Sequence, residues 1–312
     1  MLNSLPKAAF SALAGSLTLR RLASRYGMRR PDSFARRFIA GETTAQAIAT
    51  ARDIERQGLG VTLDYLGEQV TSTAAASNAT REYLSIIAEV ERAGVGRHFS
   101  VKLTQLGIDV DRATSVDNLR RILDAAGNAG FFVRVDMERS TYTDQTFDAL
   151  ETLWNIGYRN SGIAIQAYLR RSAADVSRMN ALGASVRLVK GAYHEPREVA
   201  FTHKSEVDAE FVRLMKVLLQ HGTKPAIATH DPEMIAETQR FAREHGIGPD
   251  RYEIEMLYGI RRDLQTQLAS QGYQVRVYVP FGRQWFPYFM RRLGERPANV
   301  GFVLRSLFGE KT

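Results

Sequence analysis

The sequence predicts an α/β protein, a (β/α)8 TIM-type barrel preceded by N-terminal helices. Eight short apolar, β-branched runs recur along the chain, each bounded by glycine or polar residues. Apolar residues between the runs have helical spacing, as in Leu119, Ile122 and Leu123. From Val61 to Val275 the runs recur about every 31 residues, the length of a strand and its return helix. This repeat predicts a closed barrel.

The predicted strands follow one another in a single series. The first four are GVTLDYLG (60–67), HFSVKLTQLG (98–107), FFVRVDM (131–137) and GIAIQAYL (162–169). The last four are SVRLVKGAY (185–193), KPAIATH (224–230), YEIEMLYG (252–259) and QVRVYVPFG (274–282). We expect a basic helical arm over residues 1–55 and a catalytic barrel with a C-terminal helix over residues 56–312.

Missing motifs narrow the alternatives. An open doubly wound sheet also alternates strands and helices, but no GxGxxG follows a strand and no GxxxxGK[ST] occurs. The absence of cysteine excludes disulfides, thiolate metal sites and cysteine nucleophiles. No HExxH or GxSxG occurs, and no carboxylate cluster offers a metal site. The chemistry is therefore expected to use nitrogen and oxygen groups or a cofactor, without a metal.

The net charge of +8 is concentrated in the N-terminal arm. Residues 1–40 contain eight Lys or Arg and one acidic residue, Asp32, which leaves a nearly neutral body. We therefore expect no nucleic-acid face; the arm could stay solvated or contact a membrane surface weakly. A mitochondrial transit peptide is the less favoured interpretation of the arm. No run approaches a membrane span, so a cytoplasmic protein is expected, with a peripheral position at the inner membrane face as the alternative.

Several predicted strands contain or end in polar residues that are costly to bury. They are Glu68, Lys102, Arg134, Asp136, Gln166, Arg187, Lys190, Thr229, His230, Arg276 and Tyr278. The carboxyl ends of barrel strands converge on one mouth, so these side chains are expected to meet over an apolar floor. Any one of them could be a structural ion pair. Because cations outnumber acids in the set, an anionic substrate or cofactor is predicted.

The last predicted helix carries Arg291 and Arg292, which diverge by about 100° as helix neighbours. Their long side chains could still hold one carboxylate together, although one could instead pair with Glu295. We expect the aromatic residues of this stretch to be core rather than a stacking platform: Trp285, Phe286, Tyr288 and Phe289.

The strings VKLTQLG, VRVDME, IQAYL, RLVKGAY, ATHD, EMLYG, YVPFG and RRLGE, in this order, resemble the proline dehydrogenases, flavin enzymes of proline catabolism. The resemblance runs from about Gly58 to Glu295; RLVKGAY and YVPFGxxWxxYxxRR are its most specific parts. It implies a barrel that holds FAD noncovalently at the strand ends, with L-proline over the flavin ring. The implied product is 1-pyrroline-5-carboxylate, with electrons passing to a membrane quinone. One departure is Arg296, where the family often has Asn.

The resemblance also implies roles for single residues. Lys102, Arg291 and Arg292 would bind the proline carboxylate. Asp136 and Arg187 match catalytic positions, with Arg187 beside the reducible ring nitrogen of the flavin. The implied FAD contacts are Met137, Gln166, Arg187, Lys190, Gly191, Ala192, Thr229 and His230. The remaining implied substrate contacts are Tyr193 lining the site, Leu257 and Tyr278 on the substrate ring, and Glu68, which would close the pocket by pairing with Arg291.

These roles suggest a mechanism and leave two rivals. The cationic clamp would orient proline and lower the pKa of its amine, while Arg187 would stabilise negative charge on the reduced ring. The compact chain implies that a separate pyrroline-5-carboxylate dehydrogenase uses the product. One rival is a related flavin barrel that acts on hydroxyproline or another small cyclic amine. The other is an inert barrel whose residues 1–40 dock on a membrane or on RNA.

Overall fold

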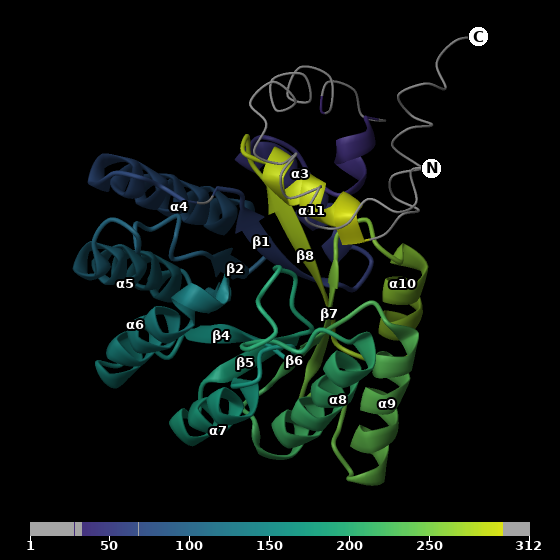
Figure 1. The fold of residues 1–312 in the computed structure, drawn as a ribbon. Helices are drawn as coiled ribbons and strands as arrows, with labels where there is room; N and C mark the ends of the chain where they lie inside the picture. Colours follow the sequence, from purple (N-terminus) through teal and green to yellow (C-terminus); the bar gives the residue numbers. More distant parts are fainter. Residues whose placement is uncertain (1–27, 29–32, 68, 296–312) are drawn as a thin grey trace, which may run out of the picture.

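The computed structural model describes residues 28, 33–67 and 69–295. Eight parallel strands form a closed barrel in chain order, with β8 paired to β1 (Figure 1). The strands are β1 Gly60–Tyr65, β2 His98–Val101, β3 Phe132–Val135, β4 Ser161–Gln166, β5 Ser185–Val189, β6 Ala226–Ala228, β7 Glu253–Leu257 and β8 Val275–Phe281. Each lies within or overlaps one of the predicted runs, and the predicted fold class is confirmed.

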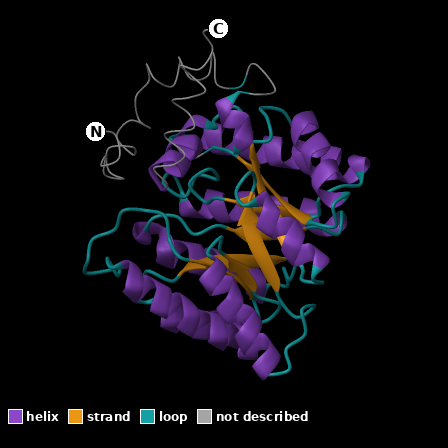
Figure 2. Ribbon diagram, turned by 90° about the vertical axis from the view of Figure 1, so that its right-hand side faces the viewer, coloured by secondary structure: helices purple, strands orange, loops and turns teal. Residues whose placement is uncertain are grey.

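Helices surround the strands on the outside of the barrel (Figure 2). They are α3 Thr44–Glu55, α4 Thr73–Ala93, α5 Arg112–Asn128, α6 Thr143–Asn155, α7 Ser172–Leu182, α8 Lys204–His221, α9 Pro232–Glu244, α10 Arg262–Ser270 and α11 Phe286–Glu295, with short 3-10 helices η1 Phe34–Arg37 and η2 Ser140–Tyr142. Polar caps start several of them: Thr43 forms a capping box on α3, and Ser72, Asp111 and Asp231 accept backbone N–H bonds at α4, α5 and α9. The predicted apolar stripe of α5 is buried.

The strands alternate between two environments, as the two-residue period of a strand requires. Val133 and Val135 belong to the core between the barrel and its helices. Arg134, between them, faces the barrel interior, where a Cβ atom on Gly162 would lie 2.6 Å from its Nη1 atom. Glycine at this position therefore makes room for a buried guanidinium. The barrel interior is charged over much of its length, so the expected apolar floor is wrong.

The wall between β8 and β1 is covered by α3, which packs against both strands and against α4. Its buried residues Ala47, Ala51 and Ile54 belong to the same core as the barrel. The boundary expected between residues 55 and 56 falls between α3 and β1. Residues 1–27 and 29–32 of the predicted arm lie outside the described residues. Among the helices that the structure describes, none combines the length and the apolar character needed to cross a membrane.

Because α3 occupies that wall, α11 takes a different position at the end of β8 (Figure 1). It packs with the η1 segment in a second, smaller core, in which the rings of Phe38 and Phe289 are 6.2 Å apart. The indole nitrogen of Trp285 donates a 3.0 Å hydrogen bond to Glu42. The prediction that the aromatic residues of α11 and the residue before it are core is confirmed, since Trp285, Phe286, Tyr288 and Phe289 are buried.

Candidate active site

A cavity of about 660 Å³ opens at the carboxyl ends of the strands, a volume suited to a small organic ligand or a cofactor. Among its described lining residues, six are basic and three are acidic, which favours an anionic occupant. The basic residues are Lys102, Arg187, Lys190, Lys204, Arg291 and Arg292; the acidic ones are Asp136, Asp231 and Glu255.

The structure brings together nearly all of the residues that the family resemblance assigned to the site. Lining the cavity are Lys102, Asp136, Met137, Gln166, Arg187, Lys190, Gly191, Ala192, Tyr193, Thr229, His230, Leu257, Tyr278, Arg291 and Arg292. Their ligand contacts stay predictions. Glu68 lies outside the described residues, and the predicted pairing of Glu68 with Arg291 lies there too.

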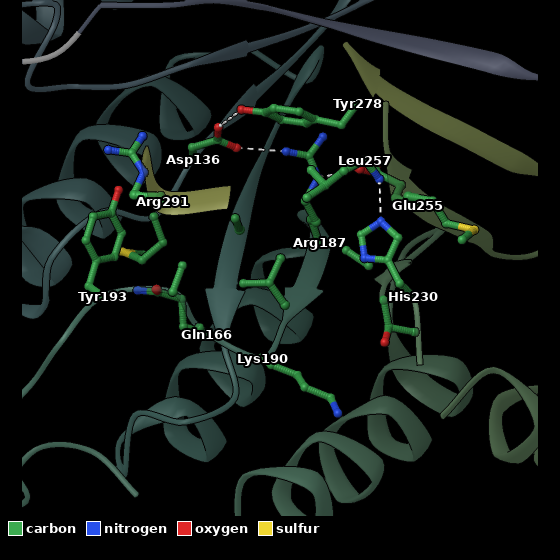
Figure 3. Close-up of a pocket in the computed structure, with 18 of the residues that line it drawn as sticks. Asp136, Gln166, Arg187, Lys190, Tyr193, His230, Glu255, Leu257, Tyr278 and Arg291 are labelled. Atoms are coloured by element: carbon green, nitrogen blue, oxygen red, sulfur yellow. Dashed lines mark hydrogen bonds and ion pairs between the residues drawn. The ribbon is translucent and has the colours of Figure 1, made fainter. Parts of the chain in front are cut away.

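Five side chains, which we call the mouth set, form a connected polar network at one wall of this cavity: Asp64, Lys102, Asp136, Arg187 and Tyr278. All of them except Asp64 line the cavity. Lys102 follows β2, and its Nζ lies 2.8 Å from Asp64 Oδ1 and 3.3 Å from Asp136 Oδ2. The Tyr278 hydroxyl donates to Asp136 Oδ2 at 2.7 Å, and Arg187 Nη1 lies 2.7 Å from Asp136 Oδ1 (Figure 3). Asp136 therefore joins two cations and a phenol from three different strands.

The electrostatics of the mouth set favour the ionised forms of Asp136, Lys102 and Arg187. Burial opposes ionisation of Asp136, but Lys102 and Arg187 outweigh it and lower the pKa of this carboxyl. Burial alone would lower the pKa of Lys102, yet Asp64, Tyr278 and Asp136 raise it well above its usual range. Burial and the charge of Asp136 raise the pKa of Tyr278 well above 10, so its phenol stays protonated and can donate.

Arg187 is fixed in place from several sides. Its Nε lies 2.6 Å from Glu255 Oε2, and its Nη1 donates to Ser100 Oγ at 2.9 Å. The guanidinium carbon lies 5.2 Å from the centre of the Tyr278 ring. Although burial acts against it, the carboxylates of Glu255 and Asp136 raise the pKa of Arg187. A guanidinium held in this way presents a constant positive charge at the cavity wall.

The wall on either side of Arg187 is built from small side chains. Ala164 of β4 and Ala228 of β6 face the cavity, and the Gly191–Ala192 turn follows Lys190 after β5. Gly191 has a φ of 118°, and a Cβ there would lie 2.3 Å from the Tyr168 ring, so only glycine allows this close approach. Small residues along one wall leave room for a flat ring system, which fits the predicted flavin.

Polar donors and acceptors around this wall also suit a flavin. His230 Nε2 accepts a 2.7 Å hydrogen bond from the Leu257 backbone, which fixes the ring orientation (Figure 3). Gln166 Nε2 donates to the Glu138 carbonyl at 2.9 Å, so its amide orientation is set as well. Both side chains line the cavity, where imidazole and amide groups can bond the polar edges of a heterocycle.

Lys190 has carboxylate partners of its own. Its Nζ lies 2.5 Å from Asp208 and 2.9 Å from Asp231. Burial acts to raise the pKa of both carboxyls, but hydrogen bonds from Lys190 outweigh it and lower the pKa. Figure 3 shows the Lys190 ammonium directed away from the Asp136 end of the cavity. Lys190 therefore serves a different part of the cavity from Lys102.

A second group of titratable residues, the floor set, consists of His98, Arg134, Glu253 and Arg276. His98, Glu253 and Arg276 are the first or second residues of their strands, and the Arg134 side chain reaches Ser185, the first residue of β5. Arg276 Nε donates to Glu253 at 2.9 Å, and Arg134 Nη1 donates to the Ser185 carbonyl at 2.7 Å. Neither arginine lines the cavity, so the expectation that both reach the mouth is wrong. Burial, reinforced by Arg276, lowers the pKa of His98 to about 3, and burial lowers that of Arg134 to about 10.

Several acids of the barrel interior were not among the predicted polar residues. Asp64, Glu253 and Glu255 pair with Lys102, Arg276 and Arg187, so the expected shortage of acids is wrong within the barrel. The excess of cations holds only for the cavity lining. The signal was present, since acids alternate with apolar residues in GVTLDYL and YEIEML, and that two-residue period places them on the inner face.

Comparisons with known proteins agree with this geometry. A family model described as proline dehydrogenase matches residues 47–305. Proline dehydrogenase 1 of Bacillus subtilis is 40% identical over 298 residues, covering 96% of this chain and 97% of that protein. Proline dehydrogenase of Deinococcus radiodurans is 40% identical over 279 residues, covering 88% and 90%.

A solved structure of proline utilization A from Bdellovibrio bacteriovorus has the same fold, with a TM-score of 0.79 at 27% identity. The match covers 89% of this chain and 34% of that longer chain, so the present chain spans about a third of it. The match of the family model, together with relatives that are 40% identical over most of their length, shows that this chain belongs to the proline dehydrogenase family.

Proposed function

We propose that the protein oxidises L-proline to 1-pyrroline-5-carboxylate, with FAD as cofactor and a membrane quinone as electron acceptor. The observation that carries the proposal is a single cavity with six basic side chains and a wall of small residues, in a member of this family. The basic side chains suit the carboxylate of proline and the phosphates of FAD, and the wall suits a planar ring.

Lys102, Arg291 and Arg292 are proposed to hold the carboxylate of proline. All three line the cavity, and they come from two elements that meet there, the end of β2 and helix α11. Charge-assisted hydrogen bonds from several directions restrict both the position and the rotation of a small substrate. Orientation of this kind can supply several kcal/mol toward the barrier.

The cofactor is proposed to lie along the small-residue wall. The residues that would hold it are Met137, Gln166, Arg187, Lys190, Gly191, Ala192, Thr229 and His230. When bound, FAD supplies the two-electron acceptor that the oxidation requires. Arg187, fixed by Asp136 and Glu255, supplies a permanent positive charge that stabilises negative charge on a neighbouring group without rearrangement.

The reaction removes a hydride from the ring carbon next to nitrogen and a proton from the amine, which leaves a C=N bond. Hydride loss requires a neutral amine. The excess of basic side chains in the lining favours that neutral form by disfavouring a second positive charge. Tyr278 and Leu257, which face the same cavity, would pack on the proline ring.

The proposed acceptor is lipid-soluble, so we propose that the protein is cytoplasmic and works at the inner face of a membrane. A separate pyrroline-5-carboxylate dehydrogenase would then consume the product. Cosedimentation with vesicles and reoxidation by a soluble quinone analogue test the first part. A flavin that is reoxidised no faster with the quinone than in its absence would contradict the proposed acceptor.

The main test is spectroscopic. Purified protein should be yellow, and anaerobic L-proline should bleach the flavin absorbance and yield an imine that o-aminobenzaldehyde traps. Hydroxyproline is the comparison substrate, and faster bleaching by it would favour the rival substrate class. A colourless protein that cannot be reconstituted with FAD, or a flavin that proline does not bleach, would contradict the proposal.

A further inference from the structure

Asp64 lies directly beneath the proposed carboxylate site and has no part in the function proposed above. It projects from β1, is 0% exposed, and does not line the cavity. Its Oδ1 lies 2.8 Å from Lys102 Nζ, the shortest of the three contacts made by that ammonium. Asp64 therefore cannot touch a ligand in the cavity, but it touches a residue that can.

Stability alone does not account for this carboxylate. Its Oδ2 is buried without a hydrogen bond from any described residue, and burial raises the pKa of Asp64, with Lys102 opposing the shift. Buried ion pairs are often no better for stability than apolar residues of the same volume. A costly buried acid next to a cavity-lining lysine is better explained by what it does for that lysine.

The other acid beside Lys102 is Asp136, which has further partners. Asp136 lies farther from the ammonium, at 3.3 Å, and it also pairs with Arg187 and accepts from Tyr278, each at 2.7 Å. Within the described part of the chain, Asp64 forms an ion pair with Lys102 alone. Asp64 is therefore the carboxylate dedicated to Lys102.

The groups around Lys102 come from four elements: Asp64 from β1, Asp136 after β3, Tyr278 from β8 and Tyr83 from α4. Lys102 is only 6% exposed, and burial works to remove its proton. Asp64 leads the groups that oppose this and raise the pKa of Lys102. Without the Asp64 charge, burial would meet less opposition, and the pKa of Lys102 should fall toward the working range of the enzyme.

We infer that Asp64 is a positioning residue, which keeps the Lys102 ammonium charged and aimed so that it can bind the substrate carboxylate. The inference rests on the proposed function, because it assumes a carboxylate ligand at Lys102. Asp64 acts on the substrate only through Lys102. Its removal should therefore change how carboxylate binding depends on pH, beyond any loss of packing.

The test measures binding of tetrahydrofuran-2-carboxylate, a proline analogue with ring oxygen in place of the amine, by calorimetry on the FAD-loaded protein. This ligand has no group that titrates between pH 6.5 and 9.5, so its pH dependence reports the protein. The wild type should bind with nearly constant affinity over this range. In Asp64→Asn, which keeps the side-chain shape, affinity should fall about tenfold toward pH 9.5 as Lys102 loses its proton.

Two variants serve as references. Thr62→Val alters the same face of β1 one layer below, at a fully buried hydroxyl, without changing charge, and should keep the wild-type pH curve. Lys102→Met should bind weakly at every pH. If Asp64→Asn does not yield folded protein, the wild-type curve still tests the inference. A wild type whose affinity falls about tenfold up to pH 9.5 would show that Lys102 loses its proton even with Asp64 present.

Several results would overturn the inference. They are an Asp64→Asn curve parallel to the wild type, the same new pH dependence in Thr62→Val, or wild-type affinity in Lys102→Met. Failure of the proposed function gives a different result. If L-proline does not bleach the wild-type flavin, the function and this inference fall together, whereas bleaching by proline with parallel pH curves overturns the inference alone.

Discussion

The two ends of the barrel interior contain the same kinds of residue, but these residues have different roles. The mouth set and the floor set each pair an arginine with a carboxylate at comparable distances, 2.7 Å for Arg187 to Asp136 and 2.9 Å for Arg276 to Glu253. The mouth set borders a cavity lined by further cations. In the floor set Arg276 pairs with Glu253, and none of the four residues lines this cavity.

The difference shows that buried charge by itself does not identify a site. Arg134 and Arg276 were expected at the mouth because they are charged and lie in strands, yet neither lines the cavity. Arg276 is the second residue of β8, and Arg134 donates from Nη1 to the carbonyl of Ser185, the first residue of β5. Position along the strand separates Lys102 and Asp136 from Arg276. Lys102 and Asp136 come directly after their strands, whereas Arg276 is the second residue of its strand.

Breaking the floor set should have the largest effect, on stability rather than on substrate binding. Glu253→Gln leaves the Arg276 guanidinium without its carboxylate in a largely buried position, and should lower the free energy of unfolding by about 3 kcal/mol. Urea unfolding measures the loss. The KM for proline should stay within about twofold of wild type, because distant sites act independently.

Its control is Glu244→Gln, which breaks a 2.7 Å pair with Arg240 on the exposed face of α9. This variant should change the free energy of unfolding by less than about 0.5 kcal/mol. A Glu253→Gln protein of normal stability but with a strongly raised KM would show that the floor set contributes to the site.

A change in the cavity lining should affect the KM for proline rather than stability. Arg292→Met removes one proposed carboxylate ligand and should raise the KM for proline about 10- to 100-fold, as expected for a lost charged hydrogen bond. FAD content and urea stability should remain close to wild type. Arg283→Met, at an exposed arginine just before α11, is the matched control and should leave KM unchanged. Wild-type proline affinity in Arg292→Met would remove Arg292 from the clamp.

The floor set should also make stability depend on pH, with a smaller effect. His98 has a pKa of about 3 in the folded protein, below the usual 6.5, so between these values the unfolded chain binds a proton that the folded chain does not. Stability should therefore decline as pH falls below 6.5, by up to about 1.4 kcal/mol per pH unit from this group. Above pH 6.5 the group has no effect.

Urea unfolding of wild type and His98→Gln between pH 6.5 and 4.5 checks this expectation. The variant should have the shallower decline, and His194→Gln, at an exposed histidine outside the floor set, should follow the wild type. Equal slopes in His98→Gln and wild type would show that other groups, such as the carboxyls of the mouth set, dominate acid sensitivity.

Much of the fold could be predicted from the sequence because each strand and return helix carries its own local pattern. The strand VRLV and the apolar stripe of α8 are short-range signals that need no knowledge of their neighbours. The path of the last helix could not be predicted in this way. Its position depends on α3 filling the wall between β8 and β1, which is a long-range packing outcome.

The positions of residues around the cavity were predicted better than the pairing of their charges, and their ligand contacts stay predictions. Motif matches placed residues such as Lys102, Gln166 and Tyr278, and all three line the cavity. Matches of this kind say nothing about which acid neutralises which base. Asp64 was missed because its partner Lys102 lies 38 positions away and on another strand. The small residues Ala164 and Ala228 were missed because space for a ligand leaves no mark in a single sequence.

The packing of α11 on the η1 segment affects the order in which the chain can fold during its synthesis. Glu42 and Trp285, which bond to each other, are 243 positions apart, and β1 and β8 close the barrel over a similar span. Contacts between residues so far apart in the sequence form late, and they make folding slower. A growing chain can assemble its early strand and helix units, but the arginines of α11 reach their positions only after all eight strands and α11 itself have left the ribosome.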